Sequence, residues 1–285
     1  MSDVESLFAR LRREGRKALL PFITAGDPDI ETTAMLLRAL AEAGADMCEV
    51  GVPYSDPIAD GPVIQASYQR ALEKGFRLEH LFRLADTVRH PAADAGPPLT
   101  IPMVTMVSYS IMLRVGIENY VRRALAAGYS GAIVPDLLVE EADDAARICR
   151  QHDFSLVQLV TPTTPRDRQL RIAELSTGFL YVVSVTGITG ERRELPSSLL
   201  ENVSWLREQT ELPICIGFGI SGPEQVRQLA PVADGLIVGS AFVRRVAAAG
   251  DDRAAMIADV KAFASELIEA MLVGQESNLP SNPAG

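Results

Sequence analysis

Two acidic side chains stand close together in the sequence and could move protons. Glu49 lies near the end of an apolar stretch over residues 47–50, and Asp60 lies at the far end of the Gly-, Pro- and Asp-rich segment that follows. A buried carboxylate is unfavourable without a partner, and this stretch supplies no lysine or arginine. Burial would raise the pKa of Glu49 toward neutrality, as general acid–base catalysis requires, while Asp60 could stay ionised and bind a substrate N–H. The alternatives are an ion pair for Glu49 and a turn-shaping role for Asp60.

Two glycine stretches could bind a phosphate group. The first includes Gly219, within Gly217-Phe218-Gly219, and the second is Gly239-Ser240. Each follows a short apolar segment, and glycine lets backbone N–H groups approach an anion closely. The alternative is that both stretches are tight turns that need glycine only for their dihedral angles.

Five apolar or aromatic side chains lie at or near the ends of predicted strands. Packing in the core is the expected role for most such residues. Together they could also form an apolar slot for a flat ring, with Glu49 and Asp60 at its edge. The five are Phe22, Ile133, Leu159, Tyr181 and Phe218.

A repeating order of strand, polar loop and helix positions these residues. Apolar runs predict eight strands, at 18–25, 47–50, 99–107, 131–134, 154–160, 178–184, 213–216 and 234–238. Helices are predicted at 30–43, 62–73, 78–88, 117–127, 140–151, 166–175, 198–209, 223–229 and 252–272, with an extra N-terminal helix around Leu7 and Leu11.

This order predicts an α/β fold, a single (β/α)8 TIM barrel with an extra N-terminal helix. The carboxyl ends of the strands would then form one active face, which brings both acids and both glycine stretches together. A doubly wound open sheet is the alternative, but even spacing and the lack of a linker favour one closed domain. We expect the catalytic barrel to span residues 1–273, and the polar segment 274–285 to be a disordered tail.

Charge and local sequence argue against nucleic acid, membranes and metal ions as partners of this chain. The net charge of −10 argues against nucleic acid and anionic membranes as main partners. The N-terminus lacks the cationic start and apolar run of a signal peptide, and prolines interrupt the one long uncharged run, so we expect a cytoplasmic protein. The three histidines, His80, His90 and His152, show no metal-ligand spacing, so no metal site is expected.

From residue 21 to residue 240 the sequence closely resembles the α subunit of tryptophan synthase. The segment 49–62, Glu-Val-Gly-Val-Pro-Tyr-Ser-Asp-Pro-Ile-Ala-Asp-Gly-Pro, matches the family signature almost residue for residue. The segments 186–190 and 217–221 match as well. The resemblance implies a lyase of tryptophan biosynthesis that cleaves indole-3-glycerol phosphate, by a retro-aldol reaction, to indole and glyceraldehyde 3-phosphate.

The resemblance also implies roles for individual residues. Glu49 would protonate indole C3 and help to remove the substrate hydroxyl proton, and Asp60 would hold the indole N–H. Thr189, on a loop that is mobile in the family, would orient Asp60. The family's phosphate-binding backbone is matched by Gly190, Gly219, Gly239 and Ser240. The walls of its indole site are matched by Phe22, Tyr181 and Phe218.

A partner is implied too. In the family, a pyridoxal-phosphate-dependent β subunit receives indole through a tunnel in an α2β2 heterotetramer. The loop 53–60, with Pro53 and Asp56, and the loop after the sixth strand would face this partner. We expect no cofactor in this chain, because pyridoxal phosphate belongs to the β subunit.

The sequence departs from the family pattern in two places. Ser110 stands where the family usually has asparagine. Leu138 ends the segment 135–138, Pro-Asp-Leu-Leu, whose prolines differ from the usual family pattern after the fourth strand. Three other functions stay open: a stand-alone lyase that releases indole, an inactive subunit that activates a β partner, and a generic phosphate-binding barrel isomerase. The presence of Glu49, Asp60 and Thr189 weighs against the inactive subunit, and the match over 49–62 weighs against the isomerase.

Overall fold

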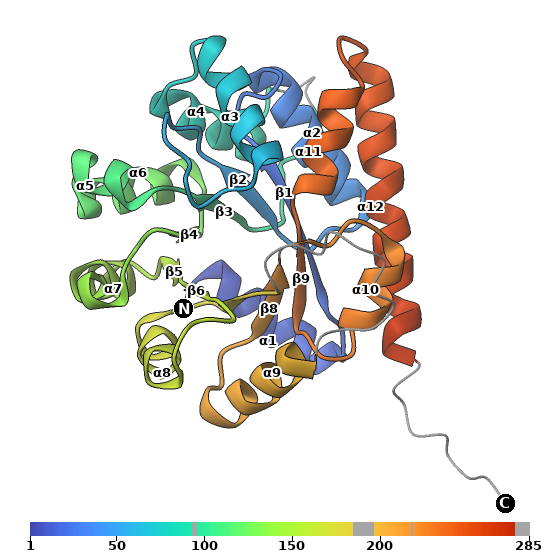
Figure 1. The fold of residues 1–285 in the computed structure, drawn as a ribbon. Coiled ribbons are helices and arrows are strands. Elements are labelled where there is room, and N and C mark those ends of the chain that lie inside the picture. Colours follow the sequence, from blue (N-terminus) through green and yellow to red (C-terminus); the bar gives the residue numbers. More distant parts are fainter. Residues whose placement is uncertain (93–95, 185–196, 218, 277–285) are drawn as a thin grey trace, which may run out of the picture.

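The chain folds into a ring of parallel strands surrounded by helices (Figure 1). The computed structural model describes residues 1–92, 96–184, 197–217 and 219–276. Within this part of the chain the strands pair in the order β5-β4-β3-β2-β1-β9-β8-β7-β6. They are β1 (Ala18–Thr24), β2 (Cys48–Gly51), β3 (Met103–Met106), β4 (Gly131–Ile133), β5 (Ser155–Val157), β6 (Leu159–Val160), β7 (Leu180–Val183), β8 (Ile214–Gly217) and β9 (Gly235–Val238).

The two ends of this order are halves of one predicted strand. Only Gln158 separates β5, which pairs with β4, from β6, which pairs with β7. The Tyr181 N–H donates to the Gln158 carbonyl oxygen at 3.2 Å, so the interruption itself is bonded to β7. The ring therefore closes through residues 155–160. This confirms the predicted (β/α)8 barrel and rules out the open doubly wound sheet.

The helices agree with the predicted ones to within a few residues, with two exceptions. Helices α5 and α11 are not predicted, because each is short and directly follows a segment that reads as a loop. The helices are α1 (Asp3–Glu14), α2 (Ile30–Ala43), α3 (Pro62–Glu73), α4 (Leu78–Arg89), α5 (Tyr109–Val115), α6 (Ile117–Ala127), α7 (Ala142–Gln151), α8 (Arg166–Leu175), α9 (Ser197–Gln209), α10 (Pro223–Leu229), α11 (Ser240–Ala248) and α12 (Arg253–Glu276), with a 3-10 turn over Val139–Glu141.

The last helix extends beyond its predicted end. Helix α12 includes residues 274–276, which the sequence assigns to a disordered tail. Gly274 is buried, and α12 packs against α10 and α2. The correction has a physical reason, since a glycine near a helix end reads as a stop signal when its packing partner is unknown. Residues 277–285 lie outside the described part of the chain.

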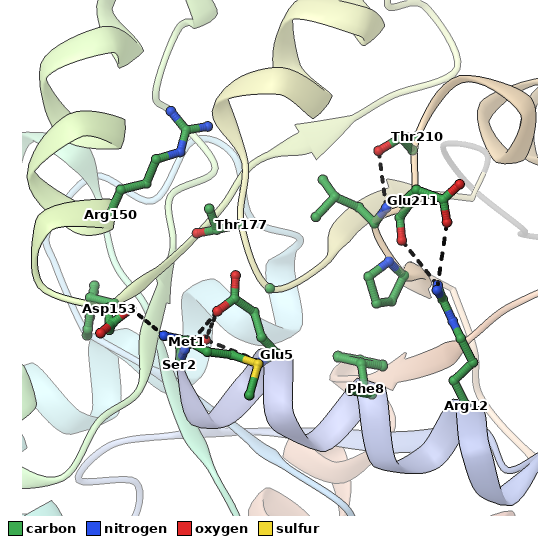
Figure 2. A pocket seen from close by; sticks show the side chains of 15 residues that line it. Met1, Ser2, Glu5, Phe8, Arg12, Arg150, Asp153, Thr177, Thr210 and Glu211 are labelled. Atoms are coloured by element: carbon green, nitrogen blue, oxygen red, sulfur yellow. Dashed lines mark hydrogen bonds and ion pairs between the residues drawn. The ribbon is translucent and has the colours of Figure 1, made fainter.

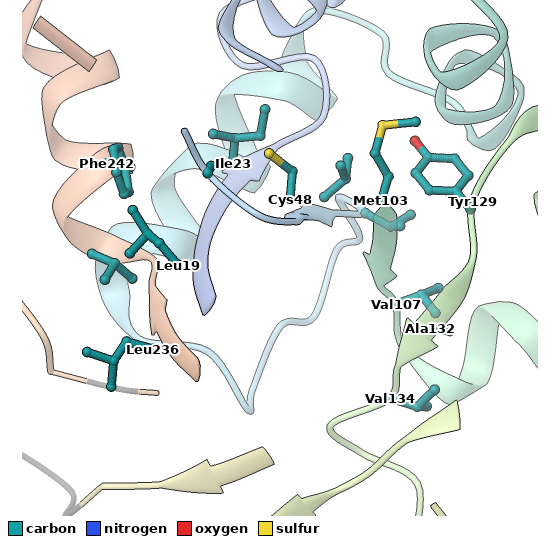
Figure 3. Packing of buried hydrophobic residues seen from close by; sticks show 14 of the residues in the cluster. Leu19, Ile23, Cys48, Met103, Val107, Tyr129, Ala132, Val134, Leu236 and Phe242 are labelled. Atoms are coloured by element: carbon teal, nitrogen blue, oxygen red, sulfur yellow. The ribbon is translucent and has the colours of Figure 1, made fainter. Parts of the chain in front are cut away.

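Buried side chains form two layers, one inside the barrel and one between the barrel and its helices. Alternate residues of a strand point to opposite faces, so Cys48 and Val50 of β2 join the outer layer. Figure 3 shows this layer, in which Cys48 lies near Ile23, and Leu19 lies near Phe242 of α11. The inner layer takes the other residues of each strand. Glu49 therefore points into the barrel.

Helix α1 closes the end of the barrel that lies opposite the predicted active face. Its four buried residues, Val4, Leu7, Phe8 and Leu11, pack with the inner layer, and the rings of Phe8 and Phe179 are 5.7 Å apart. The helix is well capped, because the Ser2 hydroxyl accepts from the Glu5 N–H and the Glu5 carboxylate accepts from the Ser2 N–H. This confirms the predicted extra helix and gives it a role as a plug.

Candidate active site

Glu49 is a buried carboxyl group without a hydrogen-bond partner for one of its oxygens. In the ladder it lies level with Phe22 on β1 and with Val104 on β3. The residue is 1% exposed, and within the described residues its Oε2 atom has no hydrogen-bond partner. Burial, followed by the negative charge of Asp60, raises the pKa of Glu49 from 4.5 to about 8. The carboxyl group is therefore protonated at neutral pH and can donate a proton.

Asp60 lies at the end of the loop that leaves β2, in a less buried environment. The loop is held by bonds from the Asp60 N–H to the Pro57 carbonyl, at 3.1 Å, and from Gln65 Nε2 to the Asp60 carbonyl, at 2.7 Å. Burial, and then the charge of Asp136, raises the pKa of Asp60 from 3.8 to about 6. Asp60 is thus ionised at neutral pH while Glu49 is protonated. Two carboxyl groups separated in this way can divide acid–base and electrostatic roles.

Three tyrosines surround the acidic pair. Burial raises the pKa of Tyr54, Tyr68 and Tyr181 above the ordinary value of 10, and the charge of Asp60 raises all three further. Glu49 adds to this effect at Tyr68 and Tyr181. The rings of Tyr54 and Tyr68 are 5.8 Å apart. Of these three, the sequence singles out only Tyr181, because Tyr54 and Tyr68 read as a loop and a helix residue.

The apolar residues predicted as a slot fall into two neighbouring clusters. Phe22 packs with Tyr68 and Val243, whereas Ile133, Leu159 and Tyr181 belong to the inner layer of the barrel. Met106 of β3 contacts both clusters and joins them.

The slot residues differ in exposure. Ile133 has no exposed surface, so it supports the slot from below, while Leu159 is half-buried. Phe218 lies outside the described residues. Met106 is missed by sequence reasoning, although its position two residues after the inward-pointing Val104 is a signal for it.

Two glycines allow large aromatic side chains to approach the strands. A Cβ on Gly51 would lie 2.4 Å from the Phe22 ring and 2.9 Å from the Tyr68 hydroxyl. A Cβ on Gly217 would lie 2.3 Å from the Tyr181 hydroxyl. Because real Cβ atoms do not approach this closely, both glycines are required for the rings to reach over the strand ends.

The predicted phosphate site lies at the start of helix α11. Gly239 is the N-cap residue of this helix and has no side-chain cap, and Ser240 is its first residue. The first backbone N–H groups of a helix lack partners within the helix and favour an anion. Gly219 is exposed just after β8. Gly190, together with the catalytic candidate Thr189, lies outside the described residues.

The loop 53–60 presents one large apolar side chain to solvent. Pro53 is buried within the chain, whereas Asp56 is exposed and Ile58 is 91% exposed. Pro53 therefore offers little surface to a partner, and the exposed part of the loop lies between residues 55 and 59. Leu138, one of the two departures from the family pattern, is also exposed, at 55%.

The other departure, Ser110, belongs to a small polar network near the same face. The Ser108 hydroxyl donates to Asp136 Oδ2 at 2.6 Å and contacts the Ser110 hydroxyl at 2.7 Å. The Tyr109 N–H donates to the second oxygen of Asp136 at 2.7 Å. Asp136 thus caps the start of α5, and its charge also reaches Asp60.

A large groove lies at the other end of the barrel and is separate from this site. It has a volume of about 630 Å³ and runs beside α1 (Figure 2). Figure 2 shows Met1 bonded to Asp153, and Arg12 bonded to Glu211. These charged groups are paired with one another, so the groove offers no acid–base pair comparable with Glu49 and Asp60.

Fold and site together define a class of protein. A closed parallel barrel that holds a protonated and an ionised carboxyl group at the carboxyl ends of its strands is a (β/α)8-barrel enzyme equipped for proton transfer. No helix in the described ranges has both the length and the apolar character needed to cross a membrane.

Comparison with known proteins identifies the family. The family model for the tryptophan synthase alpha chain matches residues 8–272. The tryptophan synthase alpha chain of Rhodopirellula baltica is 64% identical over 268 residues, which cover 93% of this chain and 95% of that protein. The counterpart from Caldanaerobacter subterraneus is 42% identical over 271 residues, with 95% and 100% covered. The chain belongs to the tryptophan synthase alpha chain family.

Solved structures agree with this assignment. Tryptophan synthase subunit alpha from Legionella pneumophila matches with a TM-score of 0.84 at 30% identity, over 95% of this chain and 98% of that one. A chain in a structure of Mycobacterium tuberculosis tryptophan synthase matches with a TM-score of 0.83 at 31% identity, over 95% and 98%. The predicted family is therefore confirmed.

Proposed function

We propose that this chain cleaves indole-3-glycerol phosphate to indole and glyceraldehyde 3-phosphate, as the α component of tryptophan biosynthesis. The observation that carries the proposal is the pair of carboxyl groups in the barrel mouth. Glu49 is buried, with a pKa of about 8, and Asp60 has a pKa of about 6. Membership of the tryptophan synthase alpha chain family supports the same reaction.

The proposed reaction needs one proton that moves out of Glu49 and one that returns to it. Protonated Glu49 gives its proton to C3 of the indole ring, and Asp60 accepts the N–H hydrogen bond and offsets the positive charge on the ring. The bond between C3 and the hydroxyl-bearing carbon then breaks, and its electron pair returns to the ring. The proton of the substrate hydroxyl passes to Glu49, and the hydroxyl oxygen becomes the carbonyl oxygen of the aldehyde product. No oxidant, metal or cofactor is consumed.

The rest of the site would hold the two ends of the substrate. Phe22, Leu159 and Tyr181, supported by Ile133, form apolar surface for the indole ring. The start of α11 at Gly239 and Ser240, with Gly219, would bind the phosphate. Three further residues lie outside the described part of the chain, and their roles are proposed from the sequence alone. Thr189 would orient Asp60, Gly190 would bind the phosphate and Phe218 would line the indole site.

We further propose a β subunit as partner, in an α2β2 heterotetramer, with Asp56 and the exposed part of the loop 53–60 at the contact. The pyridoxal phosphate would belong to that subunit, and the complex would work in the cytoplasm. The barrel would form the single catalytic domain, now taken to residue 276, where α12 ends.

One assay tests the reaction and the dependence on a partner. The purified chain is incubated with indole-3-glycerol phosphate, with and without a tryptophan synthase β subunit, and indole release is measured. Strong activation by the β subunit is the expected result. Fast release by the chain alone would instead favour a stand-alone lyase. If no indole is released under either condition, but the chain still accelerates the β subunit's own reaction, the chain is an inactive subunit that activates its partner.

A further inference from the structure

Tyr68 carries a buried hydroxyl group that has no hydrogen-bond partner in the described part of the chain. Its side chain lies on α3, and the residue is 1% exposed. Two other tyrosines are fully buried, and each hydroxyl is bonded: Tyr120 donates to Thr105 at 2.9 Å, and Tyr129 donates to the Leu81 carbonyl at 3.2 Å. A buried hydroxyl without a partner destabilises the folded chain, so it is retained where a ligand supplies the partner.

The Tyr68 hydroxyl lies inside the mouth of the barrel, on the same side of β2 as Glu49. It is 2.9 Å from the position that a Cβ on Gly51 would occupy. Gly51 is two residues after Glu49, so both face the barrel interior and lie about 7 Å apart along the strand. Glu49 Oε2, like the Tyr68 hydroxyl, has no hydrogen-bond partner among the described residues. Two unpaired polar groups thus face one region of the site.

The charges around Tyr68 make its hydroxyl a donor. Burial raises its pKa well above 10, and the negative charges of Asp60 and Glu49 raise that pKa further. The phenol therefore keeps its proton throughout the working pH range. A group that binds between Tyr68 and Glu49 must accept from the first and donate to the second once Glu49 is ionised. An alcohol hydroxyl does both.

We propose that Tyr68 is a catalytic residue whose hydroxyl donates a hydrogen bond to the substrate hydroxyl oxygen from which Glu49 takes the proton. This inference rests on the proposed lyase reaction. As the O–H bond of the substrate breaks, its electron pair forms the carbonyl bond, and negative charge develops on the oxygen before that bond is complete. The hydrogen bond from Tyr68 stabilises this charge, and the phenol keeps its own proton throughout.

The variant Tyr68→Phe removes this donor and preserves the ring that packs on Phe22. We expect kcat/KM for indole release to fall roughly tenfold to hundredfold, which is the loss for one hydrogen bond to a developing charge. The melting temperature should stay the same or rise, because an unpaired buried hydroxyl is removed. Tyr120→Phe is the matched control, and it should lower the melting temperature and leave kcat/KM unchanged.

A second measurement separates a contact with the hydroxyl from a general effect on the pocket. The probe is 3-(indol-3-yl)propyl phosphate, which has the indole ring and the phosphate but no hydroxyl group. Its Kd should be equal for the unaltered chain and for Tyr68→Phe. If Tyr68→Phe instead weakens binding of this probe by as much as it lowers kcat/KM, Tyr68 acts on the shape of the pocket, and the proposal is overturned.

Two further outcomes are distinct. Tyr68→Phe with unaltered kcat/KM and a lower melting temperature would mean that the hydroxyl serves a buried water or the fold, and would also overturn the proposal. If the unaltered chain releases no indole with or without a β subunit, the proposed function itself fails, and the role of Tyr68 fails with it.

Discussion

Glu49 and Asp60 carry the same functional group, yet their surroundings separate their pKa values to about 8 and about 6. The side chain of Glu49 points into the closed barrel and loses its hydration, whereas Asp60 stands on a loop at the mouth and keeps more of it. Each acid also raises the pKa of a neighbouring group through its charge. Near neutral pH the pair therefore holds one proton, on the more buried member.

The first prediction at the residue scale concerns Glu49→Gln. Glutamine keeps the size of the side chain and removes the proton that the reaction needs. We expect the fold to persist and kcat for indole release to fall roughly 10²- to 10⁴-fold, the usual contribution of a general acid–base. Circular dichroism would check the fold and steady-state kinetics the rate. A variant that turns over near the unaltered rate would exclude Glu49 from proton transfer.

The same variant also changes how stability depends on pH. Because the pKa of Glu49 is about 8 in the folded chain against an ordinary value of 4.5, the folded chain binds a proton that the unfolded chain releases between these values. The contribution of Glu49 to the free energy of unfolding therefore decreases as pH rises through this window, by up to roughly 5 kcal/mol. Urea unfolding at pH 5 and pH 8.5 should show a smaller decrease for Glu49→Gln than for the unaltered chain.

Asp60 gives the third prediction. The proposed reaction uses the ionised form of Asp60, so kcat/KM should fall as pH drops through about 6. The same reaction uses the protonated form of Glu49, which should set a second limit near 8. Asp60→Asn should lower kcat/KM and abolish the acidic limb. A pH profile from 5 to 9 measures both. An acidic limb that survives in Asp60→Asn would assign it to another group.

At the scale of elements, helix α1 packs against the closed end of the barrel, and we expect it to stabilise the fold without contributing to the reaction. Its apolar residues fill the closed end of the barrel, while Glu49 and Asp60 lie toward the mouth. The close packing of Phe8 on Phe179 shows how directly the plug meets the inner layer. Stability and activity should therefore be separable by substitutions in this helix.

Phe8→Ala tests this separation. Loss of a buried phenylalanine should lower the free energy of unfolding by roughly 3–5 kcal/mol, because it leaves a cavity in the inner layer. At a temperature where the variant is folded, kcat/KM should stay within a factor of about two. Arg13→Ala, on the exposed face of the same helix, is the control and should change neither quantity. A large loss of activity in folded Phe8→Ala would show that the plug and the site are coupled.

At the scale of the whole molecule, the two ends of the barrel have different tasks. One end is closed by α1, and the other carries the acids, the start of α11 and the loop with the exposed Ile58. An apolar side chain that is 91% exposed beside a reaction site is suited to burial by a partner. We therefore expect the carboxyl ends of the strands to serve both chemistry and assembly.

Ile58→Ser gives the prediction at this scale. The variant should weaken binding of a tryptophan synthase β subunit roughly tenfold, as expected for an apolar contact at an interface. Turnover by the isolated chain should not change. Leu272→Ser, at an exposed apolar position on α12, is the matched control and should bind as the unaltered chain does. Titration calorimetry measures both. Equal affinities for the two variants would place the β subunit elsewhere.

The sequence by itself determines the features that depend on local pattern. Continuous apolar runs and glycine breaks specify parallel strands and the helices between them. The order of residues 49–62 places Glu49 near the end of the second strand and Asp60 in the loop that follows it. Local pattern is weaker for short segments, so α5 and α11 are missed and the fifth strand is not divided at Gln158.

Only the tertiary structure decides what depends on residues distant in the sequence. The approach of Tyr68 to Gly51, the insertion of α1 into the barrel end and the burial of Pro53 are of this kind. The pKa of Glu49 is the clearest case, because it reflects how completely protein atoms replace water around one carboxyl group. That desolvation arises from strands contributed along the whole chain, and no local stretch of sequence contains it.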